Sequence, residues 1–188
     1  MGKPVIENFS MKMCAGEIVA VRGPSGAGKS TLLAIIAGLH KNYEGSVSTG
    51  GKIALVTQEN SLLPFLTIFQ NTVLLSKITG EKADGERARL LLKKLGLQGL
   101  EEKYPSELSG GELRRGQLAQ ALYFEPDILL ADEPFSALDI DTKSGVMSLF
   151  SDIRNKRKIT TVLVTHDSAE AEKIGGKQIT MGREGAGK

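Results

Sequence analysis

The feature that most constrains this chain is a glycine-rich loop placed between a short apolar strand and an apolar helix. The loop, Gly23-Pro24-Ser25-Gly26-Ala27-Gly28-Lys29-Ser30-Thr31, fits the pattern G-x-x-x-x-G-K-[ST]. Residues 17–22 before it have the composition of a buried strand, and residues 29–37 have that of an apolar helix. A strand, such a loop and a helix in this order are typical of a phosphate-binding loop in an α/β fold.

The residue types in this loop suit a nucleoside triphosphate. Glycines allow backbone N–H groups to turn inward on an anion, and the positive end of the helix dipole adds to the attraction. We expect Lys29 to reach the β- and γ-phosphates and the Ser30 hydroxyl to bind Mg²⁺. A glycine turn with an accidental Lys-Ser after it would leave the two flanking patterns unexplained. The loop therefore predicts a chain that binds a nucleoside triphosphate.

The composition limits the kinds of partner and cellular environment that the chain can have. The 188 residues suit a single domain, and 24 Lys and Arg residues nearly balance 22 Asp and Glu residues, which is not the charge pattern of a nucleic-acid binder. The single cysteine, Cys14, excludes an internal disulfide. There is no run of 18 apolar residues and no signal-peptide core at the N-terminus, so we expect any membrane association to occur through a partner.

The apolar pattern predicts alternating strands and helices. Strands are expected at 17–22, 52–57, 127–132, 160–165 and 177–181. Helices are expected at 29–37, from Ile68, around 88–95, at 109–122, at 141–155 and from Ser168. Residues 5–13 are compatible with one more strand, and the glycines and β-branched residues of 41–52 suggest a small hairpin.

These elements predict an α/β fold of the P-loop NTPase kind. Its core would be a mostly parallel sheet formed by residues 1–59 and 123–181, with a small antiparallel β element. Residues 60–122 would form a helical subdomain inserted into the core. We expect residues 182–188 to be a disordered tail.

Polar residues stand where three predicted strands end. Asp132 and Glu133 end one strand, His166 another and Gln58 a third, and parallel sheets bind ligands at this edge. Asp132 could hold Mg²⁺ through its water shell, and Glu133 could act as general base toward water attacking a γ-phosphate. Gln58 could orient that water or the metal ion. Two solvated charges and a structural histidine are the simpler alternative.

A second glycine-rich segment, Leu108-Ser109-Gly110-Gly111-Glu112, precedes a predicted helix. Ser109 and Glu112 have the spacing of a capping box, and the two glycines cost roughly 1 kcal/mol each in helix stability relative to alanine. In return they let an anion approach the backbone. This second anion site either belongs to the same nucleotide or serves a second copy of the protein.

The segment that follows Gln58 is unusually apolar. Residues 62–69 read Leu-Leu-Pro-Phe-Leu-Thr-Ile-Phe, and Thr67 could cap a helix that starts at Ile68. Packing into a core explains part of this run. A docking surface for another protein explains it equally well, and the sequence leaves both interpretations open.

Taken together, these motifs resemble those of ATP-binding-cassette (ABC) ATPases, the nucleotide-binding subunits of ABC transporters. In the family's order they match Walker A at 23–31, the Q-loop at Gln58, the signature at 108–112, Walker B with its catalytic glutamate at 128–133, the D-loop at 136–139 and the switch histidine at His166. The match covers nearly the whole chain. Residues 62–67 are similar to importer subunits in particular.

The resemblance implies a head-to-tail pair of subunits with two ATP molecules and Mg²⁺ between them. Residues 109–112 of one subunit would contact the nucleotide held by Walker A of the other, with Ser109, Gly111 and Asp139 at the interface. Glu133, His166 and Gln58 would act in hydrolysis, and Ser30, Gln58 and Asp132 would serve the metal ion. The pair would drive a membrane permease docked near Gln58 and 62–69, on the cytoplasmic face, without nucleic acid.

Three features depart from the family. Position 112 is Glu where Gln is commoner, although Arg114 and Arg115 could offset its charge. No aromatic residue stands well upstream of Walker A to stack on adenine, and Phe9 lies too close to the loop. The chain also ends soon after His166, so we expect no regulatory domain.

Two other functions deserve comparison. Chromosome and repair ATPases of the cassette type carry long coiled coils between Walker A and the signature, whereas only residues 32–107 separate them here. Ribosome-acting relatives usually have two cassettes. A small-molecule kinase would leave the signature and His166 unexplained. A transport ATPase therefore remains the favoured function, with a cassette ATPase acting on nucleic acid or ribosomes as the alternative.

Overall fold

The structure, a computed structural model, describes residues 5–182 and divides into two compact units. The first contains the described chain up to Thr57, then Asp127–Glu133, and the chain from Lys158 onward. The second contains Gln58–Pro126 and Pro134–Arg157. The second unit therefore holds the segment 134–157 in addition to the predicted helical insertion at 60–122.

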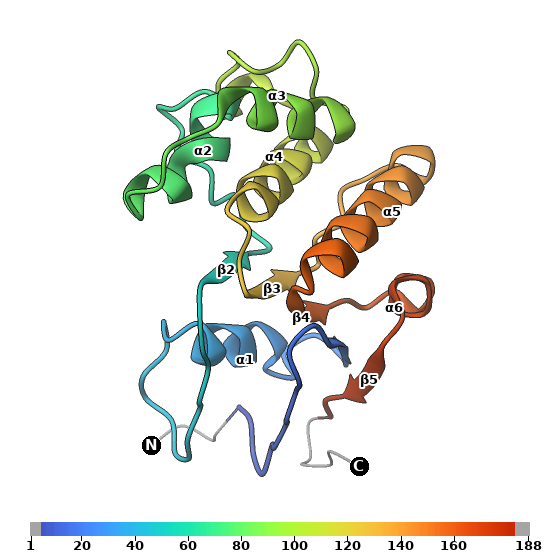
Figure 1. The fold of residues 1–188 in the computed structure, drawn as a ribbon. Helices are drawn as coiled ribbons and strands as arrows, with labels where there is room; N and C mark the ends of the chain where they lie inside the picture. Colours follow the sequence, from blue (N-terminus) through green and yellow to red (C-terminus); the bar gives the residue numbers. More distant parts are fainter. Residues whose placement is uncertain (1–4, 183–188) are drawn as a thin grey trace. The chain divides into compact units, whose positions relative to one another are not determined.

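The first unit is built on a parallel sheet, as predicted. Its five strands among the described residues run in the order β2-β3-β4-β1-β5, and every pair of neighbours is parallel (Figure 1). The strands are β1 (Ile18–Arg22), β2 (Ile53–Val56), β3 (Ile128–Asp132), β4 (Thr160–Val164) and β5 (Lys177–Thr180). Each lies within two residues of its predicted range. The near-continuous apolar runs of β1, β3 and β4 explain why these strands occupy the middle of the sheet.

In the described part of this unit there are two helices, α1 (Lys29–Ile36) and α6 (Ser168–Ile174). Helix α1 packs against β3 and β4, and its Leu32 and Leu33 enter the core. The buried members of that core are Val19, Val21, Ala27, Leu32, Leu33, Leu130, Val162, Val164 and Met181. Since β1 and α1 are both fixed by this core, the loop that joins them is held at both ends.

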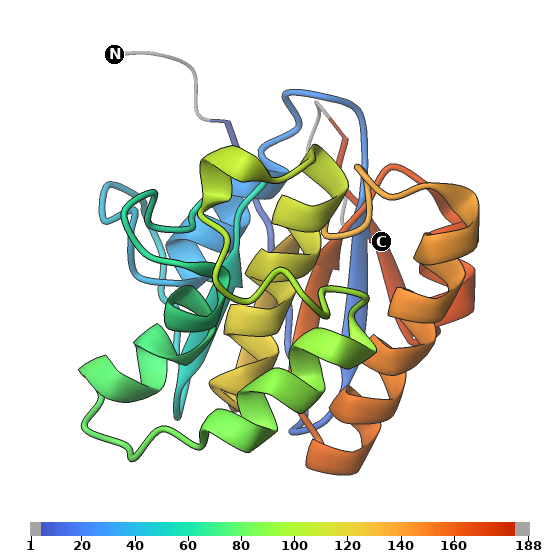
Figure 2. The same ribbon diagram turned by 90° about the horizontal axis from the view of Figure 1, so that it is seen from above.

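The second unit is helical. Its elements are α2 (Ile68–Ile78), α3 (Gly85–Lys94), the 3-10 turn η1 (Pro105–Glu107), α4 (Gly110–Tyr123) and α5 (Ile140–Arg157). Helix α4 packs on α2 and α3, and the three lie side by side in both ribbon views (Figure 2). Thr67 forms a capping box with Gln70, so the predicted start of α2 is confirmed.

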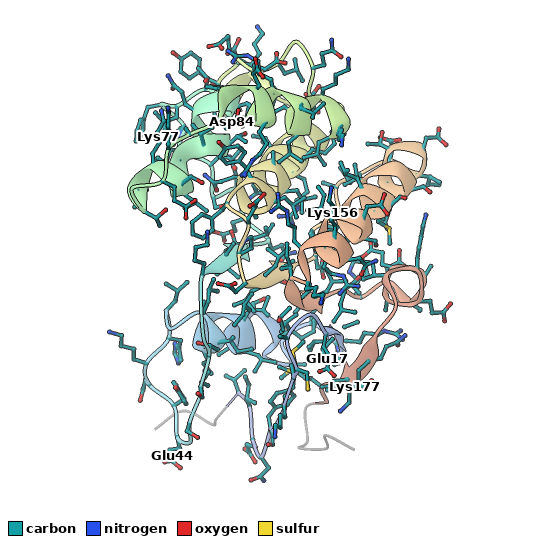
Figure 3. All side chains as sticks on the ribbon, in the orientation of Figure 1. Glu17, Glu44, Lys77, Asp84, Lys156 and Lys177 are labelled. Atoms are coloured by element: carbon teal, nitrogen blue, oxygen red, sulfur yellow. The ribbon has the colours of Figure 1, made fainter. Side chains whose placement is uncertain are left out.

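Two predicted β elements are wrong. The segment 41–52 forms no hairpin, so the small antiparallel element is absent from the described residues. Residues 38–51 are all exposed, and Figure 3 shows Glu44 at the tip of this loop. An isolated hairpin is marginal in water without an apolar face to bury, which explains the irregular loop.

Residues 5–13 also form no strand. Ile6, Phe9, Met11 and Met13 pack partly buried against the core, with exposed residues between most of them. Strand β1 already has β4 and β5 as its two neighbours, so this segment finds no partner there. The predicted disordered tail, apart from Gly182, lies outside the described residues. Within the described range, no helix combines the length and apolar character needed to cross a membrane.

Candidate nucleotide site

The phosphate loop has the backbone that its glycines predict. Gly28 stands at the N-cap of α1 with φ 89°, in the left-handed region, and no side chain caps this helix start. A Cβ on Gly28 would lie 2.7 Å from Ile6 Cγ1, and one on Gly23 would lie 2.3 Å from the Met181 carbonyl oxygen. Both positions therefore require glycine, and the first N–H groups of α1 are left for an anion.

Lys29 begins α1 and its ammonium group folds back over the loop. Lys29 Nζ donates hydrogen bonds of 2.9 Å to the carbonyl oxygens of Gly23 and Pro24. An ammonium group has three donors and no acceptor, so it suits phosphate oxygens at the same place. The loop thus combines a helix N-terminus with a positioned cation, which is the donor set that a polyphosphate needs.

The next residue of α1 reaches the end of β3. Ser30 Oγ donates a 2.5 Å hydrogen bond to Asp132 Oδ2, and Asp132 is only 6% exposed. The two side chains come from positions 102 residues apart, and the packing of α1 on β3 brings them together. A hydroxyl and a carboxylate in contact supply the oxygen ligands that Mg²⁺ prefers, so this pair fits the metal ion.

Glu133 and His166 lie at the ends of neighbouring strands. The backbone pairing of Asp132 with Val164 aligns β3 with β4, and Glu133 N–H donates to the Val164 carbonyl at 2.9 Å. Glu133 has φ 48°, in the left-handed region that non-glycine residues seldom adopt. Its Oε1 lies 3.0 Å from His166 Nδ1, and the histidine side chain is 68% exposed. Strain of this kind is concentrated at functional sites.

The turn that carries His166 is held by its own neighbours. Thr165 Oγ1 donates to Glu170 Oε2 at 2.5 Å and accepts from Asp167 N–H at 3.0 Å. Asp167 caps α6 by accepting from the N–H groups of Ala169 and Glu170. Consequently the backbone at His166 is fixed while its imidazole remains exposed.

Sequence reasoning missed Arg22, which ends β1 immediately before the phosphate loop. Its Nη2 donates to Ser168 Oγ at 3.1 Å and its Nη1 to Gln178 Oε1 at 3.3 Å. Arg22, Gly23, His166 and Thr180 line an open pocket of about 300 Å³. Arg22 therefore joins the phosphate-loop strand to the start of α6. No local pattern marks it, because its partners lie 146 and 156 residues away.

The signature residues belong to the second unit. Ser109 Oγ accepts from Glu112 N–H at 3.3 Å, while Glu112 Oε2 accepts from Ser109 N–H at 2.8 Å, which confirms the predicted capping box. The Ser109 N–H and hydroxyl donors, together with the nearby Arg115 charge, lower the pKa of Glu112. Arg115 thus compensates part of the Glu112 charge, as predicted, whereas Arg114 turns elsewhere.

The D-loop lies beside the signature within this unit. A Cβ on Gly111 would lie 3.1 Å from the Ala137 carbonyl oxygen, so the two segments are in contact. Asp139 accepts from Thr142 N–H at 2.9 Å, and hydrogen bonds from Thr142 lower the pKa of this carboxyl group. A Cβ on Gly110, in contrast, would meet no neighbouring atom within 4 Å.

The apolar segment after Gln58 divides into a buried and an exposed part. Gln58 itself is exposed, Leu62 is 4% exposed and Phe65 is 70% exposed. The fully buried Asn71 holds the loop: its Oδ1 accepts from Leu63 N–H, and its Nδ2 lies within 3.1 Å of three carbonyl oxygens, those of Leu63, Leu66 and Thr67. The burial of Leu62 confirms the packing interpretation for part of this run, while docking of another protein at the exposed Phe65 stays a prediction. Asn71 is a second residue that sequence reasoning missed.

A strand–loop–helix phosphate site with a hydroxyl–carboxylate pair and a strand-end glutamate defines the class of P-loop nucleotide hydrolases. The comparisons narrow this class. The family model described as ABC transporter matches residues 6–136. The chain belongs to the ABC transporter family, as an ATP-binding and ATP-hydrolysing subunit that uses ATP and Mg²⁺.

The relatives and solved structures agree with this assignment. The aliphatic sulfonates import ATP-binding protein SsuB of Bacillus subtilis (strain 168) is 40% identical over 181 residues, covering 92% of this chain and 71% of the relative. The "Dimeric Structure of MJ0796, a Bacterial ABC Transporter Cassette" superposes with a TM-score of 0.89 at 32% identity, covering 97% and 90% of the two chains. A post-hydrolysis dimer of the MJ0796 cassette bound to ADP and Pi has a TM-score of 0.88 at 32% identity, over 97% and 90% of the two chains.

Proposed function

We propose that this chain powers import through a membrane permease by closing, with a second subunit, around two ATP molecules. Walker A of each subunit would hold one ATP, and residues 109–112 of the other subunit would complete the site in a head-to-tail arrangement. Two observations support the arrangement: α1 has a start without a side-chain cap, and the α4 start is capped by Ser109 and Glu112. The relatives are named as import subunits, which supports the direction of transport.

The roles of the residues follow from their chemistry. Lys29 would bind the β- and γ-phosphates, while Ser30 and Asp132 would hold Mg²⁺, which neutralises phosphate charge. Glu133 would accept a proton from the attacking water, and His166 would bind the γ-phosphate while contacting Glu133. Gln58 would join this site as a neutral ligand for water or metal. In domain terms, the ATP-binding core would comprise about residues 1–59 and 123–181, with the helical subdomain at about 60–122.

The permease would contact the loop around Phe65. Asn71 holds this loop rigid through four hydrogen bonds, while the large Phe65 ring remains in solvent. A rigid exposed aromatic is the residue type that anchors protein interfaces. The subunit would therefore be peripheral, bound to the cytoplasmic face of the membrane through the permease. The near-balanced charge supports a function without nucleic acid.

The observation that carries the proposal is the 3.0 Å contact between Glu133 and His166 in the unit that also holds the phosphate loop. Size analysis of Glu133→Gln with ATP and Mg²⁺ tests it. The substitution keeps the side-chain shape but removes the base, so hydrolysis should fall at least 100-fold and a nucleotide-dependent dimer should accumulate. Glu172→Gln, an exposed acid on α6, is the matched control and should behave as wild type.

A Glu133→Gln protein that remains monomeric at high concentration with ATP would contradict the two-subunit site. ATPase activity stimulated by DNA or ribosomes would instead favour the alternative function. Co-purification of the chain with a membrane permease would support transport. These outcomes separate the choice of partner from the chemistry at Glu133.

A further inference from the structure

A buried polar side chain links the signature helix to the segment that follows Gln58. Gln117, on α4, is 3% exposed, and its Nε2 donates to the Glu59 carbonyl at 2.7 Å and to Ser61 Oγ at 3.2 Å. All of these residues belong to the second unit. Helix α4 begins at the signature, and Glu59 is the next residue after Gln58. One side chain therefore bridges two of the family's motifs.

Arg114 fixes the orientation of this amide. Arg114 is 4% exposed, its Nη1 donates to Gln117 Oε1 at 3.0 Å, and its Nη2 approaches Ser136 Oγ at 3.5 Å. Arginine has only donors, so the oxygen of Gln117 must face it and the NH₂ group must face the Glu59 carbonyl. The contacts thus run from the D-loop residue Ser136, through α4, to the backbone beside Gln58.

Gly116 brings the helix close enough for these bonds. A Cβ at this buried position would lie 3.1 Å from Leu62 Cδ1 and 3.4 Å from Ile68 Cδ1. Glycine in a helix interior is unfavourable, which indicates that close packing is the reason for it here. Residues 116 and 117 therefore hold the 59–62 segment against α4 by apolar contact and by hydrogen bonds together.

We propose that Gln117 and Arg114 are positioning residues that couple the signature helix to Gln58; this inference rests on the proposed function. A buried amide whose partner moves away is left unsatisfied, so displacement of α4 must carry the 59–61 backbone with it. When the first turn of α4 meets the nucleotide of a second subunit, the position of Gln58 follows. Through Gln117 and Arg114, the contact of α4 with a second subunit would thus be transmitted to Gln58.

Gln117→Glu tests the coupling without emptying the core. The carboxylate has the same size and still accepts from Arg114, but it cannot donate to the Glu59 carbonyl or to Ser61. Gln120→Ala is the matched control, because Gln120 also lies on α4 and donates to a backbone carbonyl, that of Asn71, at 3.0 Å. Gln117→Ala serves as a second variant, so that no conclusion depends on the new charge alone.

Two measurements on the full chain give the answer. Hydrogen–deuterium exchange without nucleotide should show uptake of residues 58–63 raised at least three-fold in both Gln117 variants and unchanged in Gln120→Ala. Steady-state ATPase assays should show kcat lowered at least five-fold, with KM for MgATP within two-fold of wild type. If Gln117 had a merely structural role, the Gln117 variants and Gln120→Ala would lose stability alike. Exchange at 58–63 and kcat would then not differ between the Gln117 variants and the control.

Unchanged exchange at 58–63 in the Gln117 variants would overturn the inference, and so would raised exchange with a wild-type kcat. The proposed function fails by a different result. A Glu133→Gln protein that does not dimerise with ATP would contradict the proposed nucleotide site shared by two subunits. The exchange measurement, made without nucleotide, would still stand as support for the bridge from α4 to Glu59.

Discussion

Two helices of this protein begin at glycine-rich sequences, and their first turns are built in opposite ways. The N-cap of helix α1 is Gly28, with φ 89° and no side-chain cap. The N-cap of helix α4 is Ser109, whose side chain forms a reciprocal capping box with that of Glu112. Both starts looked like anion sites in the sequence, because glycine allows close approach in each.

The difference shows which start depends on a ligand. An uncapped helix N-terminus leaves donors that need an acceptor, and we expect the phosphate loop to bind one, with Lys29 beside it. The capping box at the α4 start gives the N–H groups of Ser109 and Glu112 partners from within the chain, so this part of the start needs no anion. It offers Ser109 and the open Gly110 position to a group that arrives from outside. In the proposed head-to-tail pair, this capped start would meet a nucleotide only when the second subunit arrives.

The largest expected effect is the difference in ATP affinity between two glycine-to-alanine substitutions, one at each helix start. Gly28→Ala should lower ATP affinity at least ten-fold, because φ 89° costs about 1–2 kcal/mol for alanine and the new Cβ meets Ile6. Gly110→Ala, where a Cβ meets nothing within 4 Å, should keep both the fold and the ATP affinity. Fluorescent-nucleotide titration measures the ATP affinity of the two variants. Equal losses in the two variants would remove the distinction between the starts.

An intermediate effect should come from removing one hydroxyl. Ser109→Ala deletes the N-cap and should lower the free energy of unfolding by about 1 kcal/mol, with Tm lower by roughly 2–4 °C. Ser25→Ala makes the same change in the exposed part of the phosphate loop and should stay within about 0.5 kcal/mol of wild type. Denaturant melts of the nucleotide-free chain measure both. A destabilised Ser25→Ala with a stable Ser109→Ala would reverse the comparison.

The smallest effect concerns the charge of Glu112. Glu112→Gln can keep the capping box, so ATPase activity should be equal to or above that of wild type. The folded state lowers the pKa of Glu112, so its stabilisation is present above the unfolded pKa of about 4.3 and is lost as pH falls through the folded pKa. Tm measured between pH 6 and pH 3 should therefore fall slightly more in wild type than in the glutamine variant. A large loss of ATPase activity would contradict this account.

Local patterns predicted most of the fold and of the site. The loop at Gly23–Thr31, the capping boxes of α2 and α4 and the apolar strands all depend on residues close in sequence, so their signals were readable. The hairpin predicted at 41–52 failed because its local composition had no apolar face to bury. The structure of such a segment depends on whether other elements pack against it, and its own composition does not predict that packing.

The parts that could not be predicted depend on distant partners. Arg22 meets Ser168 and Gln178, and Gln117 meets the Glu59 carbonyl, 58 residues earlier in the chain. Neither residue carries a motif, and glutamine or arginine at such positions ordinarily indicates an exposed surface. The left-handed backbone of Glu133 was equally invisible, since nothing in Asp-Glu-Pro specifies it.

The residue types for the chemistry of this protein were determined by its sequence, because the phosphate loop, the Asp132-Glu133 pair and His166 each stand in or beside a short recognisable segment. The tertiary structure decided how those residues meet. It placed Ser30 against Asp132 and His166 against Glu133, and it turned Leu62 inward while leaving Phe65 exposed. Such contacts arise when separate elements pack on a common core. The free energy of that packing depends on several distant segments together, so no single segment predicts it.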